Sequence, residues 1–456
     1  MTDLETQPPP EHPPLGAGGR DKGPTPAPQP KMSLLLIVGL VVLLGLSGGW
    51  SILVVVAAII VMIFLHELGH YLTAKWAGMK VTEFFLGFGP KVWSFQRGET
   101  EYGIKAIPAG AYVRVIGMNN LEEVAPEDEP KTYRQQPFWR RLSVAVAGST
   151  MHFLLALVCL WALLVFHGAP GGTFAQSDAD YRASTAWVIG SVSDGSAARA
   201  AGLRDGDKIT AIDGQPVGAF QDLRDVIEPN AGKIVELRVL RDGTSTELAA
   251  TLGTNPDGSG HGFLGVGPTV PNEKAGPIAG IGRSFGEFFA IGRESIGALG
   301  DRFSPSGLAD LGSRVAEGGS NDQGPVVADP NPSSPNNTGS SSSSSSSDDG
   351  QRFISLIGAA QIGSELTRGG WAGLAIFMVM LNIFIGIFNL VPLLPLDGGH
   401  VAVAVYEKIR SMLQGGKRYQ ADVLKLMPLT YAVVGVLILI GVSSMYLDIV
   451  SPIRIN

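Results

Sequence analysis

The sequence predicts a polytopic α-helical membrane protein with four core transmembrane helices, small membrane-associated β hairpins and one inserted α+β module. Charged residues make up only 16% of the 456 residues, and the mean hydropathy is positive at +0.21. Soluble domains, by comparison, are about one quarter charged. Apolar runs of helical length recur at residues 50–65, 143–166, 371–391 and 429–450, which predicts the four core spans.

The net charge and the cysteine count argue against a nucleic-acid-binding protein and against a fold held by disulfides or by a cysteine-based metal site. The net charge of −7 gives no reason to expect a nucleic-acid partner. The single cysteine, Cys159, excludes an intrachain disulfide framework and a cysteine-based zinc site. It lies in an apolar run and is interpreted as a small core residue.

The N-terminal part divides into a tail and a membrane region. Residues 1–31 are Pro-rich and predict a disordered tail. Residues 32–72 form the first membrane region, without a charged side chain from Met32 to Leu65. The Ser47-Gly48-Gly49 turn favours two helices and thus a fifth, N-terminal span. One long tilted helix or a re-entrant segment is the alternative.

A metalloprotease-type motif, His66-Glu67-Leu68-Gly69-His70, ends this apolar run. Residues four apart share one face of a helix, so His66 and His70 can both ligate one Zn²⁺ ion. Glu67 then stands where a general base is needed. The alternative is a surface helix with hydrogen-bonded histidines, but ionisable groups at membrane depth are costly and usually functional.

Residues 75–141 form a basic loop, which the positive-inside rule places in the cytoplasm together with the nearby His70. The segments 81–88 and 101–116 have β-type composition. Turns are predicted at Gly87-Phe88-Gly89-Pro90 and at Pro108-Ala109-Gly110. We expect small hairpins that dip toward the active site, and a plain cytoplasmic loop is the alternative.

The middle of the chain holds one span and one extracytoplasmic module. Residues 142–167 predict a transmembrane helix, and residues 183–268 alternate short strands and helices. The string Ala-Gly-Leu-Arg-Asp-Gly-Asp-Lys-Ile at 201–209 resembles a PDZ domain of the bacterial protease-associated kind. The resemblance implies that this module binds peptide C-termini or strands at a sheet edge.

The C-terminal part returns to the membrane. Residues 277–303 predict an amphipathic, interfacial or gating helix, and the Ser-rich residues 304–350 predict a flexible linker. Residues 352–406 form a membrane region whose span is broken by Pro392 and Pro395 before Leu396-Asp397-Gly398-Gly399-His400. The last span is residues 428–450.

A catalytic zinc site needs one more protein ligand besides the two histidines. Asp397 is favoured, because a carboxylate at membrane depth is untenable unless a partner such as a metal ion neutralises it. Glu83, His152 and His400 are the alternatives.

The HELGH motif, Gly87-Phe88-Gly89-Pro90, the single PDZ-like module and the segment from Asn389 to Gly399 together resemble the site-2 protease family, particularly its actinobacterial type. The resemblance implies intramembrane zinc proteolysis with His66, His70 and Asp397 as ligands and Glu67 as base. It also implies that Asn389 binds the substrate. Gly148-Ser149 and His152 depart from a Gly-Pro and an Asn that are frequent in the family.

The expected function is regulated intramembrane proteolysis at the plasma membrane, in contact with membrane lipid. The resemblance implies single-pass substrates such as anti-sigma factors, already cut outside by a site-1-type protease. Strands around Gly87 and Gly89 would hold the unwound substrate. The alternatives are a membrane-anchored PDZ binding protein with a non-catalytic metal site and a zinc or proton transporter.

Overall fold

The structure is a computed structural model that describes residues 30–118, 122–174, 184–255, 259–316, 355–368, 370–415 and 419–450. The predicted Pro-rich tail lies outside these residues up to position 29. Most of the predicted Ser-rich linker also lies outside them.

Four helices in the described residues are long and apolar enough to cross a membrane: Gly49–Trp76, Phe138–His167, Trp371–Asn389 and Leu424–Asp448. They lie where the sequence predicts the four core spans. They fall in α1 (Pro30–Trp76), α2 (Phe138–Ala162) with its continuation η3 (Leu163–His167), α9 (Trp371–Asn389), and η6 (Val423–Leu426) with α11 (Met427–Val450). The chain is thus built as a multi-pass membrane protein.

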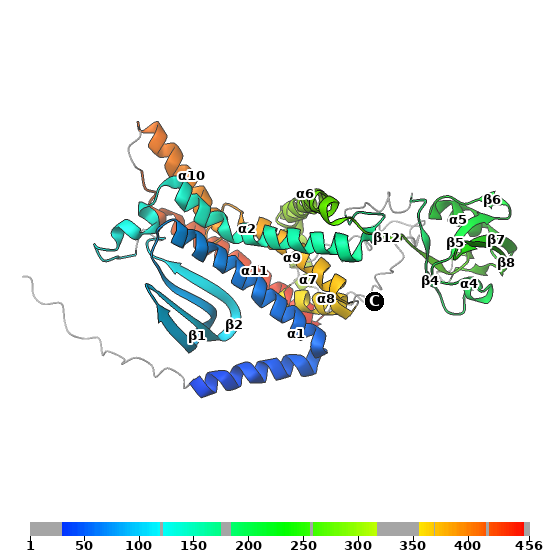
Figure 1. The fold of residues 1–456 in the computed structure, drawn as a ribbon, viewed down its shortest axis with the longest axis horizontal. Helices are drawn as coiled ribbons and strands as arrows, with labels where there is room; N and C mark the ends of the chain where they lie inside the picture. Colours follow the sequence, from blue (N-terminus) through cyan, green and yellow to red (C-terminus); the bar gives the residue numbers. More distant parts are fainter. Residues whose placement is uncertain are drawn as a thin grey trace, which may run out of the picture.

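α1 is kinked at Gly49, where φ is +67°. Its first part turns sharply away from the rest of the molecule (Figure 1). The kink lies within the predicted Ser47–Gly49 turn, so the chain forms two helical segments there. Only the second segment is among the four candidate spans. A fifth, N-terminal span therefore stays a prediction.

α2 is the central helix of the bundle, packed against both α1 and α9. Its small and branched residues Ala156 and Leu160 are buried with Ile383 of α9. Because apolar side chains gain little by leaving lipid, close packing of this kind is what associates helices in a membrane. α2 thereby brings the first and third spans to a common depth.

One long hairpin, β1 (Val81–Arg97) and β2 (Thr100–Val115), follows the first span (Figure 1). Residues 81–86 pair on one side with 111–115 and on the other with 101–104, while 91–97 pair with 100–105. The two bent strands therefore form four adjacent segments, and residues 111–115 are an edge of this sheet. The sequence predicts several small hairpins, and the structure replaces them with this single folded one.

An aromatic contact fastens the hairpin to the first span. The hydroxyl oxygens of Tyr71 and Tyr102 lie 2.6 Å apart, and the Phe84 ring stacks on Tyr71. Tyr71 directly follows His70 in the sequence. The hairpin is therefore held beside the motif helix, as the prediction of strands near the active site requires.

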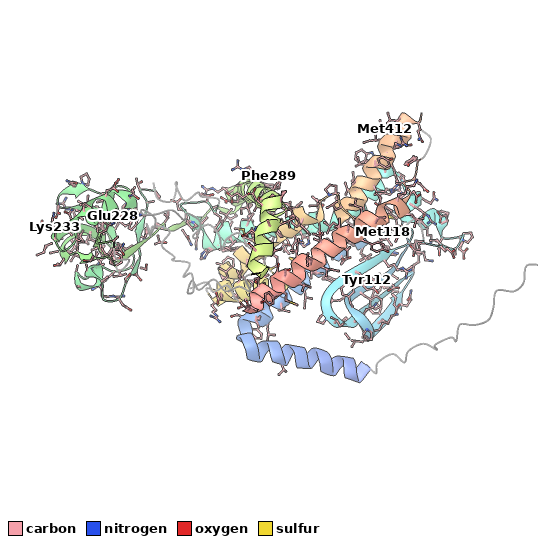
Figure 2. All side chains as sticks on the ribbon, turned by 180° about the vertical axis from the view of Figure 1, so that it is seen from behind. Tyr112, Met118, Glu228, Lys233, Phe289 and Met412 are labelled. Atoms are coloured by element: carbon pink, nitrogen blue, oxygen red, sulfur yellow. The ribbon has the colours of Figure 1, made fainter. Side chains whose placement is uncertain are left out.

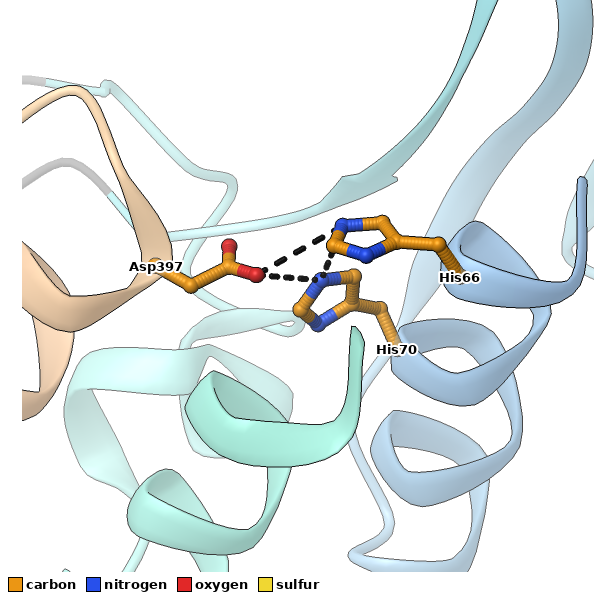
Figure 3. A group of neighbouring side chains, drawn as sticks. All are labelled: His66, His70 and Asp397. Atoms are coloured by element: carbon orange, nitrogen blue, oxygen red, sulfur yellow. Dashed lines mark hydrogen bonds and ion pairs between the residues drawn. The ribbon is translucent and has the colours of Figure 1, made fainter. Parts of the chain in front are cut away.

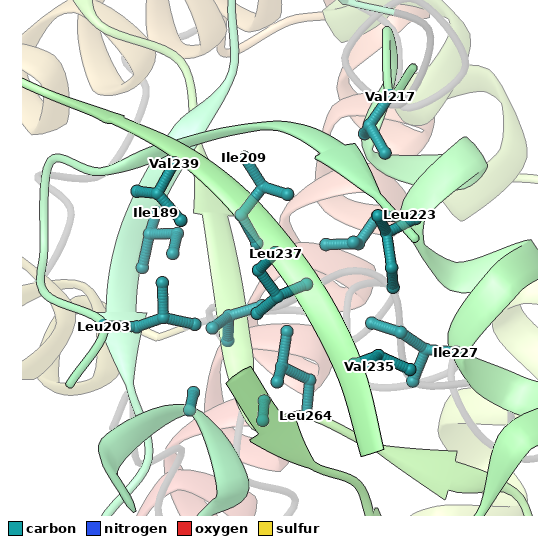
Figure 4. Close-up of a cluster of buried hydrophobic side chains, with 14 of the residues drawn as sticks. Ile189, Leu203, Ile209, Val217, Leu223, Ile227, Val235, Leu237, Val239 and Leu264 are labelled. Atoms are coloured by element: carbon teal, nitrogen blue, oxygen red, sulfur yellow. The ribbon is translucent and has the colours of Figure 1, made fainter. Parts of the chain in front are cut away.

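The PDZ-like module has its own core (Figure 4), and short strands and helices alternate in it, as predicted. A four-stranded sheet has the order β6-β5-β7-β8, and β4 pairs with β11. Its elements are β4 (Val188–Val192), α4 (Ala197–Ala200), β5 (Lys208–Ile212), β6 (Gln215–Pro216), α5 (Phe220–Ile227), η4 (Glu228–Asn230), β7 (Ile234–Arg241), β8 (Thr244–Thr251), β9 (Gly253–Thr254), β10 (Gly262–Phe263) and β11 (Val266–Thr269). Alternate residues of β7 (Val235, Leu237 and Val239) point inward, as the two-residue period of a strand requires.

An ion pair holds the Asp-Gly-Asp turn of this module. Nε and Nη2 of Arg241 donate to the two carboxylate oxygens of Asp207, each at 2.7 Å. Burial by itself would raise the pKa of Asp207, but these bonds and the N–H of Arg204 outweigh it, so the pKa is lowered. The turn that carries the PDZ resemblance is thus fixed by a bidentate contact.

The two chain segments that join this module to the membrane helices are paired with each other. β3 (Ala169–Pro170) pairs with β12 (Asn272–Glu273), directly after the second span and before α6 (Pro277–Arg302). The buried carboxylate of Glu287 on α6 accepts bonds from the Thr173 hydroxyl and the Phe174 N–H. α6 packs on α2 and α9, although its face with Ile278 and Phe289 is exposed.

The remaining elements correct the linker prediction. The structure has a helix, α7 (Pro305–Ala316), at the start of the predicted 304–350 linker, and a second one, α8 (Leu356–Arg368), before the third span. α7 has apolar residues on one face, and this face contacts α11 at Leu311. The linker prediction, which rests on the Gly and Ser content of the segment, does not take this face into account. The short helices η1 (Glu129–Lys131) and η2 (Tyr133–Gln135) precede α2, and α10 (Asp397–Leu413) precedes α11.

The module and the hairpin lie at opposite ends of the molecule. Figure 2, seen from behind, shows Lys233 and Glu228 in the module at one end, and Tyr112 of the hairpin and Met412 of α10 toward the other. The hairpin lies alongside the part of α1 that is farther from the module in both views.

Candidate metal centre and active site

Three donor atoms from two distant parts of the chain converge (Figure 3). His66 and His70, one turn apart on α1, place their Nε2 atoms 3.2 Å from each other. Oδ2 of Asp397 lies 3.5 Å from Nε2 of His66 and 3.2 Å from Nε2 of His70. The structure therefore brings together the two motif histidines and the favoured third candidate.

The protonation of His70 shows that this cluster calls for a cation. Its Nδ1 lies 2.8 Å from the carbonyl oxygen of Val144 on α2, so Nδ1 carries the proton and Nε2 offers a lone pair. Oδ2 of Asp397, which the lone pair faces, is buried and has no hydrogen-bond donor among the described residues. Two lone pairs at 3.2 Å repel each other unless a proton or a metal ion lies between them.

The spacing of the cluster fits Zn²⁺. A tetrahedral zinc site with bonds of about 2.0–2.1 Å separates its donor atoms by roughly 3.3–3.4 Å. The three separations here are 3.2, 3.2 and 3.5 Å. Two imidazoles and one carboxylate are also a usual catalytic zinc set, leaving one position for water. The bond from His70 to Val144 is the kind of outer contact that orients such a ligand.

A break in the third membrane region sets Asp397 in place. α9 ends at Asn389, and the segment with Pro392 and Pro395 cannot continue a regular helix. α10 then begins at Asp397 itself. A side chain at Gly398 or Gly399 would collide with the backbone of residues 390–394, so the start of α10 can lie against this segment only with glycines there. The Gly-Gly pair therefore places the carboxylate at the motif helix.

Glu67 lies between the hairpin edge and a cavity beside the motif. The backbone N–H of Val113, in the edge segment 111–115, donates a hydrogen bond to the Glu67 carboxylate. Next to it lies a cavity of about 250 Å³. Its lining consists of Ile59, Met62, Ile63, His66, Glu67, His152, Ala359, Leu381, Ile385 and Asn389. The Glu67 carboxylate, three further polar side chains (His66, His152 and Asn389) and apolar walls thus surround one space at membrane depth.

The other candidates from the sequence lie elsewhere or have other partners. His152 bonds to Asn382 through Nδ1, and His400 packs its ring against Tyr133. Glu83 accepts a bond from Tyr112 within the hairpin. None of these three belongs to the donor cluster formed by the described residues.

The predicted substrate-binding residues separate into two groups. Asn389 lines the cavity. Gly87 and Gly89 lie at the bend of β1, with φ of +88° and +83°, and pack against Ile107. They are not among the described residues that line this cavity. The part of the hairpin that reaches Glu67 is instead the edge at Val113.

Gly148 offers a direct test of the packing behind the metal ligands. A Cβ atom at this position would lie within 2.6 Å of both ring nitrogens of His66. We expect Gly148→Ala to weaken zinc binding by about tenfold or more, since such overpacking typically costs about 1–3 kcal/mol. A chelator competition titration measures this. Gly441→Ala on α11, whose Cβ meets nothing within 4 Å, is the control, and equal zinc affinity in both variants would contradict the packing argument.

Sequence reasoning missed the groups that support the site through their backbone. The Val144 carbonyl and the Val113 N–H are present in every residue type, so no sequence signal marks them. Asn382 could have been found, because an amide inside an apolar span requires a partner. α8 contributes Ala359 to the cavity, and nothing in its composition marks that role.

The fold and site define a membrane-embedded zinc metalloprotease, and comparison with known proteins agrees. Residues 54–430 match the family described as peptidase family M50. The zinc metalloprotease Rip1 of Mycobacterium tuberculosis is 32% identical over 87% of this chain and 96% of its own length. Rip1 of Mycolicibacterium smegmatis is 31% identical over 89% of this chain and 99% of its length.

The chain therefore belongs to peptidase family M50, the site-2 protease family that its motifs resemble. It is a zinc metalloprotease, and its cofactor is Zn²⁺. A PDZ domain of the SdrC-like protein from Listeria monocytogenes also matches 18% of this chain and 87% of that chain, with 25% identity and a TM-score of 0.17.

Proposed function

We propose that this enzyme cleaves transmembrane segments of single-pass membrane proteins, with His66, His70 and Asp397 as zinc ligands and Glu67 as general base. The observation that carries the proposal is the position of Glu67, which faces a cavity between the first and third spans and bonds to a sheet edge. A peptide bond reaches such a cavity most directly from within the membrane.

When bound, zinc would supply Lewis acidity that makes a water molecule more acidic and polarises a carbonyl group. Glu67 would accept the proton of the attacking water and deliver it to the leaving amine. The Val113 N–H would keep the Glu67 carboxylate aimed into the cavity. The carbonyl of Val144 would hold His70 in the tautomer that leaves Nε2 free for the metal.

The substrate must unwind before its bond can react, because a helix hides its carbonyl and N–H groups in its own hydrogen bonds. We infer that the edge at 111–115 pairs with the opened strand, since it lies beside Glu67 and follows the usual mode of strand addition. This takes over the role that the sequence suggests for Gly87 and Gly89, which would instead provide the bend. Asn389 would bond to the backbone of the opened strand.

The orientation and partners complete the proposal. The basic loop at 75–141 favours a cytoplasmic position for the hairpin, and the PDZ-like module lies at the opposite end of the molecule. We therefore place the active site toward the cytoplasmic half of the plasma membrane and the module outside. There the module would bind peptide C-termini or strands of proteins already trimmed by a site-1-type protease, anti-sigma factors being one such class.

Asn389 tests the unwinding step. We expect Asn389→Ala to slow cleavage of a synthetic single-span peptide with a stable helix by about three- to tenfold, the range of one lost hydrogen bond. A second peptide with a helix-weakening Asn-Pro pair at mid-span should be slowed less, because it opens more readily. Purified enzyme in detergent and mass spectrometry of the products provide the rates. Unchanged cleavage of the helix-stable peptide would count against the role of Asn389.

A further inference from the structure

A buried polar pair closes the back of the active-site cavity. His152 on α2 and Asn382 on α9 are 3% and 0% exposed, and Nδ1 of His152 lies 2.8 Å from Oδ1 of Asn382. Two helices of the bundle therefore meet through one hydrogen bond between side chains at membrane depth. Such a bond can serve packing alone, but His152 also lines the cavity that contains Glu67.

The neighbours of Asn382 determine which nitrogen of His152 carries the proton. Nδ2 of Asn382 donates to the carbonyl oxygen of Met378 at 2.7 Å, which fixes the orientation of the amide. A flipped amide would set Oδ1 against that carbonyl oxygen, so Oδ1 must face His152. Nδ1 of His152 is then the donor, and Nε2 of the neutral ring offers a lone pair.

This lone pair is not part of the metal cluster. The donor set formed by the described residues is His66, His70 and Asp397, and the ring centre of His152 lies 4.9 Å from that of His66. The rest of the cavity wall is largely apolar, with Met62, Ile63 and Ile385 among its residues. A fixed hydrogen-bond acceptor in such a wall needs a donor.

An unwound peptide supplies that donor. Opening a turn of helix frees N–H groups as well as carbonyl groups, and each one is costly to leave unpaired away from water. The metal and Glu67 act on the carbonyl and the water, and neither accepts an N–H of the peptide. His152 is the imidazole beside His66 in the wall of the same space.

We propose that Nε2 of His152 accepts a hydrogen bond from a backbone N–H of the unwound substrate, with Asn382 as the positioning residue that fixes its tautomer. The inference rests on the proposed function, because it presumes a peptide in this cavity. His152 thereby favours the opened substrate over the closed helix. Asn382→Leu should weaken the effect without removing it, since the ring would then adopt either tautomer.

The test measures binding in a Glu67→Gln background, so that no turnover interferes. The probe is a fluorescent synthetic peptide of about 25 residues with one span and an Asn-Pro pair at its centre. We expect His152→Phe, which keeps an aromatic ring beside His66, to weaken binding about ten- to hundredfold. His152→Gln, which can bond to Asn382 and still present an oxygen, should recover most of the affinity. Zinc content and thermal unfolding should match in all variants.

A set of probes with one backbone amide replaced by an ester identifies the contact, since each ester removes a single N–H. At one position the ester should weaken binding about tenfold when His152 is present and less than about twofold when Phe replaces it. The effect of the ester on helix stability cancels in this comparison. The inference is overturned if every ester costs the two proteins the same, if His152→Phe binds as tightly as His152, or if no saturable binding is seen.

Failure of the proposed function gives a different result. Cleavage of the same probe by the wild-type enzyme tests that function separately. A zinc-loaded wild type that leaves the probe intact counts against intramembrane proteolysis. An active wild type with equal ester costs counts only against the contact with His152.

Discussion

Glu67→Gln is expected to reduce the rate of peptide cleavage by about 10²–10⁴-fold, the range that one positioned acid–base group contributes. Glutamine keeps the size of the side chain and can still accept a hydrogen bond from the Val113 N–H. It cannot accept a proton from water, so only the chemical step should suffer. The measurement is cleavage of a single-span peptide by purified enzyme, together with zinc content by mass spectrometry.

Zinc binding and peptide binding should survive this change, because Glu67 is not among the clustered donor atoms. Glu83→Gln provides the matched control. Its carboxylate accepts a bond from Tyr112 in the hairpin and lies outside the cluster, so the rate should change by less than about threefold. If Glu67→Gln retained a rate close to that of wild type, the assignment of the base would be wrong.

Asp397→Ala is expected to weaken zinc binding at least about 100-fold, more than the 10- to 100-fold typical of an outer-shell partner. The two imidazoles of His66 and His70 would remain, but the donor set that the described residues form would lose its carboxylate. Cleavage should disappear at zinc concentrations that saturate the wild type. Competition with a chelator gives the affinity directly, without relying on activity.

His400→Gln separates this effect from general damage to α10. His400 lies three positions after Asp397 on the same helix and packs against Tyr133, outside the donor cluster. This variant should bind zinc as the wild type does. The assignment of Asp397 fails if His400→Gln loses the metal and Asp397→Ala keeps it.

The sequence was most informative where one residue type has few physical alternatives. Two histidines four apart at the end of an uncharged run predict a metal site, and Asp397 beside Pro395 at membrane depth needs a partner. The structure joins them across more than 300 residues of chain, through α2 packed between α1 and α9. Periodicity also predicts α5 and β7, where burial repeats with helical and strand spacing.

Features that depend on long-range backbone geometry could not be predicted. The glycines at 87 and 89 indicate a turn, but they do not reveal that both strands fold over and present residues 111–115 to Glu67. The helix at Pro305–Ala316 has an apolar face that only its contact with α11 explains. The polar residues of α8 give no indication that this helix lies beside the cavity, where Ala359 faces the motif helix.

The two alternative functions predict different experimental results. A PDZ binding protein with a non-catalytic metal site would show the same peptide binding with Glu67 or Gln at position 67 and no cleavage with either. A transporter would move zinc or protons across a vesicle membrane. The membership in peptidase family M50 and the position of Glu67 in the cavity favour the protease over both.

The most direct test of intramembrane cleavage compares the membrane proteins of cells that carry the wild-type enzyme with those of cells that carry Glu67→Gln. Mass spectrometry of protein ends is the measurement. Membrane-anchored fragments of single-pass proteins should accumulate with Glu67→Gln, and the matching cleaved ends with the wild type should map inside their apolar spans. Identical fragments in both cells, or new ends that all lie outside the spans, would contradict the account.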